Sequence, residues 1–201
     1  MRATRLRDYV DRRKDNQFDL MFPLEVREMS HVHWTPVSVA HQAAEFLVSR
    51  PGTKVLDVGC GPGKFCIVGA LMTEGTFTGI EQRRYLCELA TARIRQVGLR
   101  NATILHGNVV HLDFSDFDAF YLFNPFEENL EELLKIDSSV PLSGELFEHY
   151  TRYVARELAR APVGTRVVTY CGGCEEVPTG YECVATSREF SLKFWEKTRG
   201  V

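Results

Sequence analysis

The sequence VLDVGCGPGKF, residues 55–65, passes from an apolar, β-like run into three glycines at alternate positions. Glycine adopts positive φ without strain and allows a ligand to lie against bare backbone. The apolar stretch that follows, GKFCIVGALM, predicts the start of a helix. Residues 55–65 therefore predict a strand, a glycine turn and a helix, with a ligand site at the turn.

Short β-rich runs and helical stretches alternate along the rest of the chain. We expect strands at 53–58, 76–80, 102–106, 117–123 and 166–170, and helices at 35–49, 63–73, 83–97, 127–136 and 143–160. Thr35 and Pro36 predict the start of the first helix, as N-cap and first helical residue. This alternation predicts an open α/β sheet of parallel strands joined by right-handed crossovers.

The end of the chain departs from the alternation. Residues 181–187 and 189–198 are two strand-like runs with no helix between them. They predict an antiparallel hairpin at one edge of the sheet.

Composition narrows the class of protein. A chain of 201 residues with 44% hydrophobic content suits one domain, and a net charge of −3 gives no reason to expect nucleic acid as a partner. The first twenty residues have no apolar core typical of a secretory signal, and no apolar run approaches the roughly 20 residues that span a bilayer. Six cysteines in such a chain are expected to be reduced thiols, so we expect a cytoplasmic protein.

Two phosphate-binding patterns do not fit the glycine turn. A phosphate loop needs glycine at 58 and a hydroxyl at 65, where the chain has Val58 and Phe65. A dinucleotide fold has glycines spaced G-x-G-x-x-G, whereas these three are evenly spaced. Asp57, at the tip of the strand, would repel a pyrophosphate and attract an ammonium group, so a ligand with a cationic amino-acid end is favoured.

These residues resemble the class I S-adenosylmethionine-dependent methyltransferases, from about residue 34 to 171. VLDVGCGPGKF resembles the first motif of that family, FTGIEQ (77–82) the second and LHGNV (105–109) the third. The resemblance implies that Glu81 accepts the ribose hydroxyls and that Asn108, where the family usually has aspartate, meets the adenine edge. It assigns these residues to S-adenosylmethionine: Thr35, Asp57, Gly59, Cys60, Gly61, Gly63, Glu81, Gln82, Asn108, Val109 and Asn124.

The same resemblance implies a Rossmann-like fold with helices on both faces of the sheet. Seven strands are expected, the last antiparallel and inserted beside the fifth, which agrees with the hairpin read from the end of the chain. Residues 1–34 are expected to form a helical segment that covers the cofactor, and residues 35–201 the methyltransferase domain. Within the first of these, Trp34 would wall the pocket. His31 and His33 are expected to be surface or structural residues, with the alternative that one of them accepts a proton.

YLFNPFEENL, residues 121–130, is where the methyl acceptor is expected. Asn124-Pro125-Phe126 resembles the [DNS]-P-P-[YFW] motif of amino-methylating members, with one proline missing. The resemblance gives these three residues the catalytic role and favours a nitrogen acceptor, by in-line displacement at the sulfonium methyl. The alternative is that Asn124 caps the helix expected at 127–136 and Phe126 belongs to the core.

Two further features leave alternatives open. The acidic run 127–137 is either a lip that attracts a cationic amine or a protein side chain, or a solvated helix face. Cys171-Gly-Gly-Cys174 is a metal half-site, a redox pair or, as we expect, a turn after the fifth strand, and no metal site is expected. Transfer to oxygen or carbon, aminopropyl transfer and cofactor binding without catalysis remain alternatives to nitrogen methylation.

Overall fold

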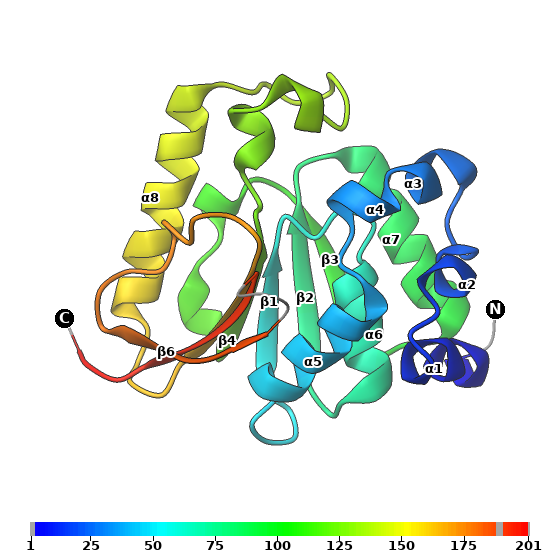
Figure 1. The fold of residues 1–201 in the computed structure, drawn as a ribbon, viewed down its shortest axis with the longest axis horizontal. Helices are drawn as coiled ribbons and strands as arrows, with labels where there is room; N and C mark the ends of the chain where they lie inside the picture. The colour runs from blue at the N-terminus through cyan, green and yellow to red at the C-terminus, as the bar shows by residue number, and fades with distance from the viewer. Residues whose placement is uncertain (1–2, 188–190, 201) are drawn as a thin grey trace.

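A seven-stranded sheet forms the centre of the protein (Figure 1). The computed structural model describes residues 3–187 and 191–200. The strands are β1 (Lys54–Val58), β2 (Thr76–Glu81), β3 (Ala102–His106), β4 (Ala119–Phe123), β5 (Arg166–Tyr170), β6 (Tyr181–Ser187) and β7 (Leu192–Lys197). Their order is β3-β2-β1-β4-β5-β7-β6, and β7 pairs antiparallel with β5 and β6 while the other neighbours are parallel. The expected α/β sheet, its C-terminal hairpin and the place of the last strand beside the fifth are confirmed.

Eight α-helices are described around this sheet: α1 (Ala3–Asp11), α2 (Asp15–Asp19), α3 (Leu24–Glu28), α4 (Ser30–His33), α5 (Val37–Leu47), α6 (Lys64–Met72), α7 (Arg84–Val97) and α8 (Gly144–Arg160). Alternate residues of the strands point to opposite faces, as the period of two requires. Tyr121 of β4 packs with α5 and α6, whereas its neighbours Phe120 and Leu122 pack with α8. No helix among the described residues is long and apolar enough to cross a membrane.

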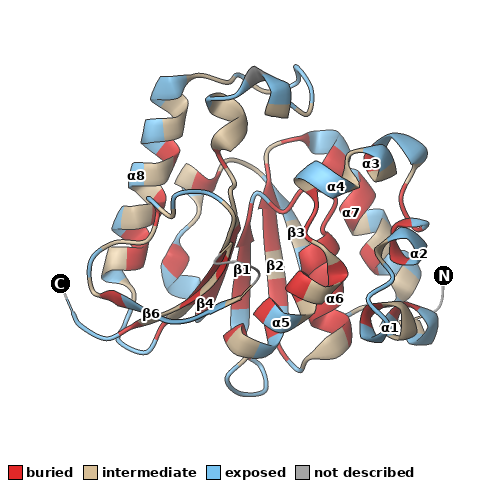
Figure 2. Ribbon diagram, viewed as in Figure 1, coloured by how far each residue is buried: buried red, intermediate tan, exposed pale blue. Residues whose placement is uncertain are grey.

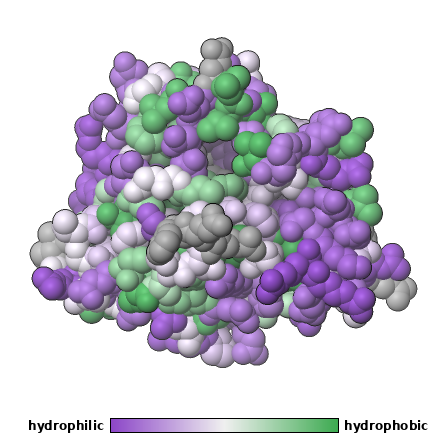
Figure 3. Space-filling view, in the orientation of Figure 1, coloured by the Kyte–Doolittle hydropathy of each residue, from purple (hydrophilic) through white to green (hydrophobic). Residues whose placement is uncertain are grey.

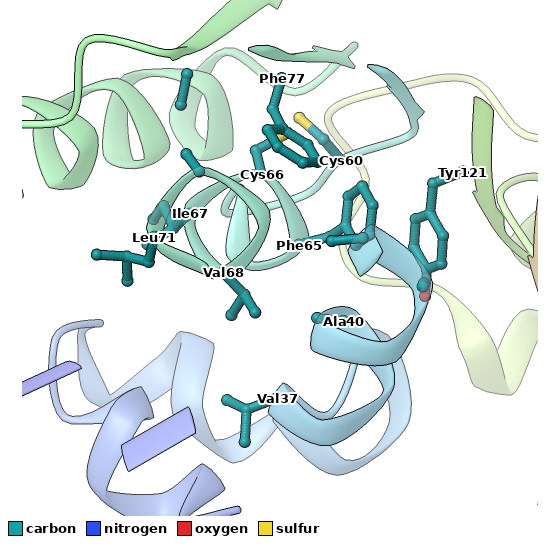
Figure 4. Packing of buried hydrophobic residues seen from close by; sticks show 14 of the residues in the cluster. Val37, Ala40, Cys60, Phe65, Cys66, Ile67, Val68, Leu71, Phe77 and Tyr121 are labelled. Atoms are coloured by element: carbon teal, nitrogen blue, oxygen red, sulfur yellow. The ribbon is translucent and has the colours of Figure 1, made fainter. Parts of the chain in front are cut away.

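Helix α6, which follows the glycine turn, is almost completely enclosed. Residues 64–71 are all buried (Figure 2), because α6 packs against the sheet, α5 and α1. Figure 4 shows its side chains in this cluster, where the Phe65 ring stacks on Tyr121 with centroids 3.9 Å apart. A helix that is apolar on all sides is stable only when buried. The N-terminal helices provide that cover.

A buried ion cluster fastens the N-terminal helices to α6. Lys64, 2% exposed, places its Nζ 2.9 Å from Asp15 Oδ1 and 2.7 Å from Asp19 Oδ1. It also donates to Ser30 Oγ at 3.4 Å, and Ser30 in turn donates to Asp19. Because two carboxylates and a hydroxyl surround the ammonium group, its charge is compensated inside the protein.

The expected start of α5 was wrong. Pro36 is the N-cap and the helix begins at Val37, whose N–H donates to Asp15 Oδ1 at 2.8 Å. The Thr35 hydroxyl lies 3.0 Å from the Tyr121 hydroxyl instead of capping the helix. The Asp15 carboxylate of α2 therefore caps α5, the role that was expected of Thr35.

The helix expected at 127–136 was also wrong. The chain there forms two short 3₁₀ turns, Glu127–Asn129 and Glu132–Leu134. Leu130 and Leu133 have helical spacing, but they are 49% and 95% exposed. Because most helical stability in proteins comes from a buried apolar face, this segment has little to hold a helix together.

Candidate active site

A pocket lies at the carboxyl ends of β1, β2 and β4, where the order of the strands reverses. In open α/β sheets this is the place at which ligands bind. Its lining consists of Val32, His33, Trp34, Val58, Gly59, Gly61, Ile80, Glu81, Gln82, Arg83, Gly107, Val109, Phe123, Asn124, Pro125, Phe126, Glu127, Glu128, Leu134 and Ile136. Figure 3 shows hydrophobic and hydrophilic residues next to one another on the surface around the loop after β4 and helices α3 and α4.

The glycine turn has no room for side chains, because Trp34 and the loop after β4 pack against it. Gly59 and Gly61 have φ of +72° and +53°, which side chains rarely adopt. A Cβ on Gly61 would lie 2.4 Å from the Trp34 ring, and one on Gly59 would lie 3.2 Å from Pro125 Cβ. Trp34 is held in place by its indole N–H, which donates to the Val26 carbonyl at 2.7 Å. Trp34 therefore walls the pocket, as the resemblance implied.

Glu81 faces the glycine turn from the end of β2. Its Oε2 accepts the Gly61 N–H at 3.0 Å, and its Oε1 accepts the Arg83 N–H at 2.7 Å. Burial raises the pKa of Glu81, while the Arg83 N–H and guanidinium and the Gly61 N–H lower it. A carboxylate has about four lone-pair positions, so acceptor capacity remains for the hydroxyls of a ligand in the pocket.

Asp57 lies near the end of β1, just before the glycine turn, and does not line the pocket. It is 3% exposed, and its Oδ2 accepts a hydrogen bond from the Cys66 thiol at 3.4 Å. Its pKa is raised to about 7, mainly by burial, with the Cys66 thiol lowering it and the charge of Glu81 raising it. Within the described part of the chain, no lysine or arginine forms an ion pair with Asp57.

Four other residues assigned to the cofactor also lie outside the lining: Thr35, Cys60, Gly63 and Asn108. The Asn108 side chain accepts the Val110 N–H at 3.1 Å and donates to Gln82 Oε1 and the Tyr150 hydroxyl. It thus caps the short turn that follows and positions Gln82. Gly107, Val109 and Gln82 form the pocket wall on this side, and an adenine contact of Asn108 stays a prediction.

Asn124, Pro125 and Phe126 form the end of the pocket after β4. Asn124 has φ of +41°, and its Oδ1 lies 2.6 Å from where a Cβ of Gly172 would be. No α-helix follows, and the 3₁₀ turn at 127–129 has Phe126 as N-cap with no side-chain cap bond. The alternative that Asn124 caps a helix was therefore wrong. Phe126 is 4% exposed and packs on Tyr150, so it belongs both to the core and to the pocket wall.

Two carboxylates of the acidic run, those of Glu128 and Asp137, pair with Arg83. Arg83 is 4% exposed and donates to both carboxylate oxygens of Glu128, at 2.8 and 2.7 Å, and from Nε to Asp137 at 3.0 Å. Sequence analysis missed Arg83. The sequence shows only a cation two residues after Glu81 and an acidic run at 127–137. No local pattern indicates that Arg83 pairs with that run.

His33 of α4 lines the pocket, whereas His31 is exposed and does not. Burial lowers the pKa of His33, and the charge of Glu128 raises it. A half-buried imidazole with a lowered pKa is neutral at neutral pH and able to accept a proton.

Cys171 and Cys174 flank the glycine turn that was expected after β5. Both have positive φ, of 58° and 68°. The Cys174 thiol lies 3.3 Å from the Thr169 hydroxyl and accepts from Lys193 Nζ at 3.5 Å. No cluster of three or more metal-ligating side chains occurs in residues 3–187 and 191–200.

Comparison with known proteins agrees with this geometry. Residues 49–140 match the family described as "Methyltransferase domain". Demethylmenaquinone methyltransferase of Listeria welshimeri is 29% identical, over 62% of this chain and 60% of the relative. That of Bacillus cereus (strain AH187) is 30% identical, over 33% of this chain and 29% of the relative. The chain thus spans about 60% of the length of the first curated relatives that it matches.

Solved structures share the fold at low identity. An RNA methyltransferase from Salinibacter ruber in complex with S-adenosyl-L-homocysteine is 16% identical with a TM-score of 0.57, covering 83% of this chain and 95% of that chain. A mutant of MtNAS in complex with S-adenosylmethionine is 15% identical with a TM-score of 0.56, covering 98% of this chain and 78% of that chain. Residues 49–140 are therefore similar to a methyltransferase domain, and the chain shares the fold of these two solved structures.

Proposed function

We propose that this protein binds S-adenosylmethionine in the pocket and transfers its methyl group to a nitrogen atom of an acceptor. The observation that carries the proposal is the meeting of Glu81, the bare glycine turn and Asn124 in one pocket. In this arrangement residues 1–34 cover the cofactor and residues 35–201 form the catalytic domain. A cytoplasmic location stays a prediction.

The cofactor is expected to lie across the ends of β1 and β2. Glu81 would accept the ribose hydroxyls, and Gly107, Val109 and Gln82 would contact the adenine. The methionine end would lie on the glycine turn above Asp57. A buried carboxyl with a pKa near 7 and no ion-pair partner among the described residues favours the approach of an ammonium group.

The acceptor nitrogen is expected at Asn124. The side-chain amide offers an oxygen that orients the lone pair of a neutral nitrogen, and Pro125 and Phe126 exclude water. Holding donor and acceptor at near-attack distance supplies up to roughly 7–11 kcal/mol of barrier lowering, so little acid–base chemistry is needed. For a protonated amine, His33 is the group that would take the proton, because it lines the same pocket as a neutral imidazole.

A second candidate is transfer to carbon or oxygen of an apolar ring. The relatives from Listeria and Bacillus act, by their names, on demethylmenaquinone. Phe123, Leu134 and Ile136 give this pocket an apolar wall that suits such a molecule. The two candidates differ in the fraction of the cell that contains the acceptor.

Methyl-labelled S-adenosylmethionine, incubated with the protein and a fractionated lysate, tests the proposal. Label on an amine nitrogen in the aqueous or protein fraction, lost in an Asn124→Ala variant, is the expected result. Label in a solvent extract, on a ring carbon or oxygen, would replace nitrogen transfer by the second candidate. Tight cofactor binding with no label in any fraction would leave a non-catalytic binding domain.

A further inference from the structure

We propose that Arg83 is a positioning residue that couples cofactor binding at Glu81 to closure of the acceptor segment, residues 124–142, over the pocket. This inference rests on the proposed function, because it takes the cofactor to be the ligand of Glu81. It adds that the acceptor segment completes the pocket only when the cofactor is bound.

Arg83 holds the acceptor segment at two separate points. The fork of its guanidinium binds both oxygens of Glu128, in the first 3₁₀ turn, and its Nε binds Asp137, where the segment returns. Asp137 in turn accepts from the N–H and hydroxyl of Ser139, and Glu128 accepts the Ile136 N–H at 3.5 Å. Charge-assisted, two-point bonds of this kind fix orientation as well as distance.

Besides Arg83, the acceptor segment is held mainly by Phe126, which packs on Tyr150, and by the half-buried Ile136, which packs on the core. Its regular structure consists of two three-residue turns, and Leu130 and Leu133 are exposed. Segments with few buried apolar contacts open locally at low free energy. The same segment contributes Asn124, Phe126 and Leu134 to the pocket, so its opening would dismantle the acceptor end.

The other side of Arg83 belongs to the cofactor site. Its backbone N–H donates to Glu81 Oε1, and its guanidinium lowers the pKa that burial raises in Glu81. A ribose on Glu81 fixes this carboxylate, and with it the backbone from which the Arg83 side chain extends. Coupling between two sites is reciprocal, so a closed acceptor segment must also strengthen cofactor binding by the same factor.

Hydrogen exchange of the acceptor segment, followed by mass spectrometry with and without S-adenosylhomocysteine, tests this coupling. In the wild-type protein saturating S-adenosylhomocysteine should slow exchange in residues 127–142 at least tenfold. Arg83→Gln should lose this slowing at ligand concentrations that calorimetry shows to be saturating. Arg84→Gln, an exposed neighbour on the first turn of α7, is the matched control and should behave as wild type.

Asp137→Asn separates coupling from a direct effect on the cofactor, because Asp137 does not line the pocket. It should speed exchange of the segment in the free protein about three- to tenfold and weaken S-adenosylhomocysteine by no more than that factor, because affinity follows the fraction of protein that is closed. Ser139→Ala, which removes one Asp137 contact and leaves Arg83 alone, should change neither. Equal exchange with and without bound ligand, or wild-type exchange in Asp137→Asn, would overturn the inference and leave the proposed function standing. Absence of binding by the wild-type protein would overturn both.

Discussion

Asp57 is a carboxyl group held inside the protein with a thiol as its hydrogen-bond donor. Burial raises its pKa to about 7, so it is part protonated at neutral pH in the free protein. An ammonium group beside it would favour the ionised form and lower that pKa. Ligand binding and the ionisation of Asp57 should therefore be linked.

This linkage predicts a pH dependence of cofactor affinity. If Asp57 holds the ammonium group, its ionised form is the one that binds, and affinity for S-adenosylhomocysteine should rise from pH 6 to pH 8 and level off above the pKa of about 7. Asp57→Asn should flatten this dependence and weaken binding roughly ten- to a hundredfold, the usual effect of losing a charge-assisted bond. Isothermal titration calorimetry at three pH values measures both. An equal pH slope in the variant would show that another group controls binding.

The same residue should make the free protein less stable as the pH rises. The pKa of Asp57 is about 7 in the folded state against 3.8 for an exposed carboxyl. As the pH rises, the unfolded chain therefore loses this proton before the folded protein does. The free energy of unfolding that the protonated group contributes is lost between pH 3.8 and a pH of about 7. Asp57→Asn should stabilise the free protein at pH 8 by at least about 1 kcal/mol, the equivalent of one pKa unit. Thermal unfolding that favours the wild type at pH 8 would contradict this.

Asn124 has a strained backbone and lines the end of the pocket after β4, with its amide oxygen beside Gly172. Two variants separate these roles, since Asn124→Gly relieves the φ of +41° and Asn124→Ala does not. If the amide orients the acceptor, both should lose about 10²-fold in turnover at unchanged cofactor affinity. Methyl transfer and thermal melting are measured on the same preparations. Full activity in Asn124→Gly would mean that only the backbone matters.

At the scale of elements, the sequence predicted every strand to within a few residues. Period-two burial and apolar runs such as 166–170 are local signals, and the structure follows them. The wrong predictions fall where a residue distant in the sequence determines the local structure. Asp15 caps α5 in place of Thr35, and Arg83 holds residues 127–137 in a form other than a helix.

Lys64 is another such residue, since a lysine after a glycine turn is ordinarily exposed. Removing one partner of a buried ion pair leaves the other charge uncompensated, which costs about 3–5 kcal/mol. Lys64→Ala should therefore lower the free energy of unfolding by about this amount and loosen α1 to α4. Urea unfolding and hydrogen exchange of residues 3–34 measure the two effects.

Lys54→Ala is the matched control, because Lys54 is exposed at the start of β1. Its free energy of unfolding should stay within about 0.5 kcal/mol of wild type, as for other surface substitutions. If Lys64→Ala matched it, the ion cluster would not be what fastens the N-terminal helices.

For the whole molecule, the sequence predicts the sheet and part of the pocket, because short motifs at the carboxyl ends of neighbouring parallel strands lie close together. The lining includes Gly59, Gly61, Glu81, Gln82, Val109 and 124–126, as expected. The ties between distant segments, Lys64 with Asp15 and Arg83 with Asp137, lie 49 and 54 residues apart. No local pattern pairs such residues, so only the structure shows them.

The proposed function requires that this pocket bind S-adenosylmethionine through Glu81. A calorimetric titration with S-adenosylmethionine, on the wild-type protein and on Glu81→Ala, measures this binding. We expect one saturable site in the wild type, weakened roughly ten- to a hundredfold in the variant by loss of the charge-assisted bonds to the ribose. No saturable binding by the wild type, or equal binding by both proteins, would contradict it.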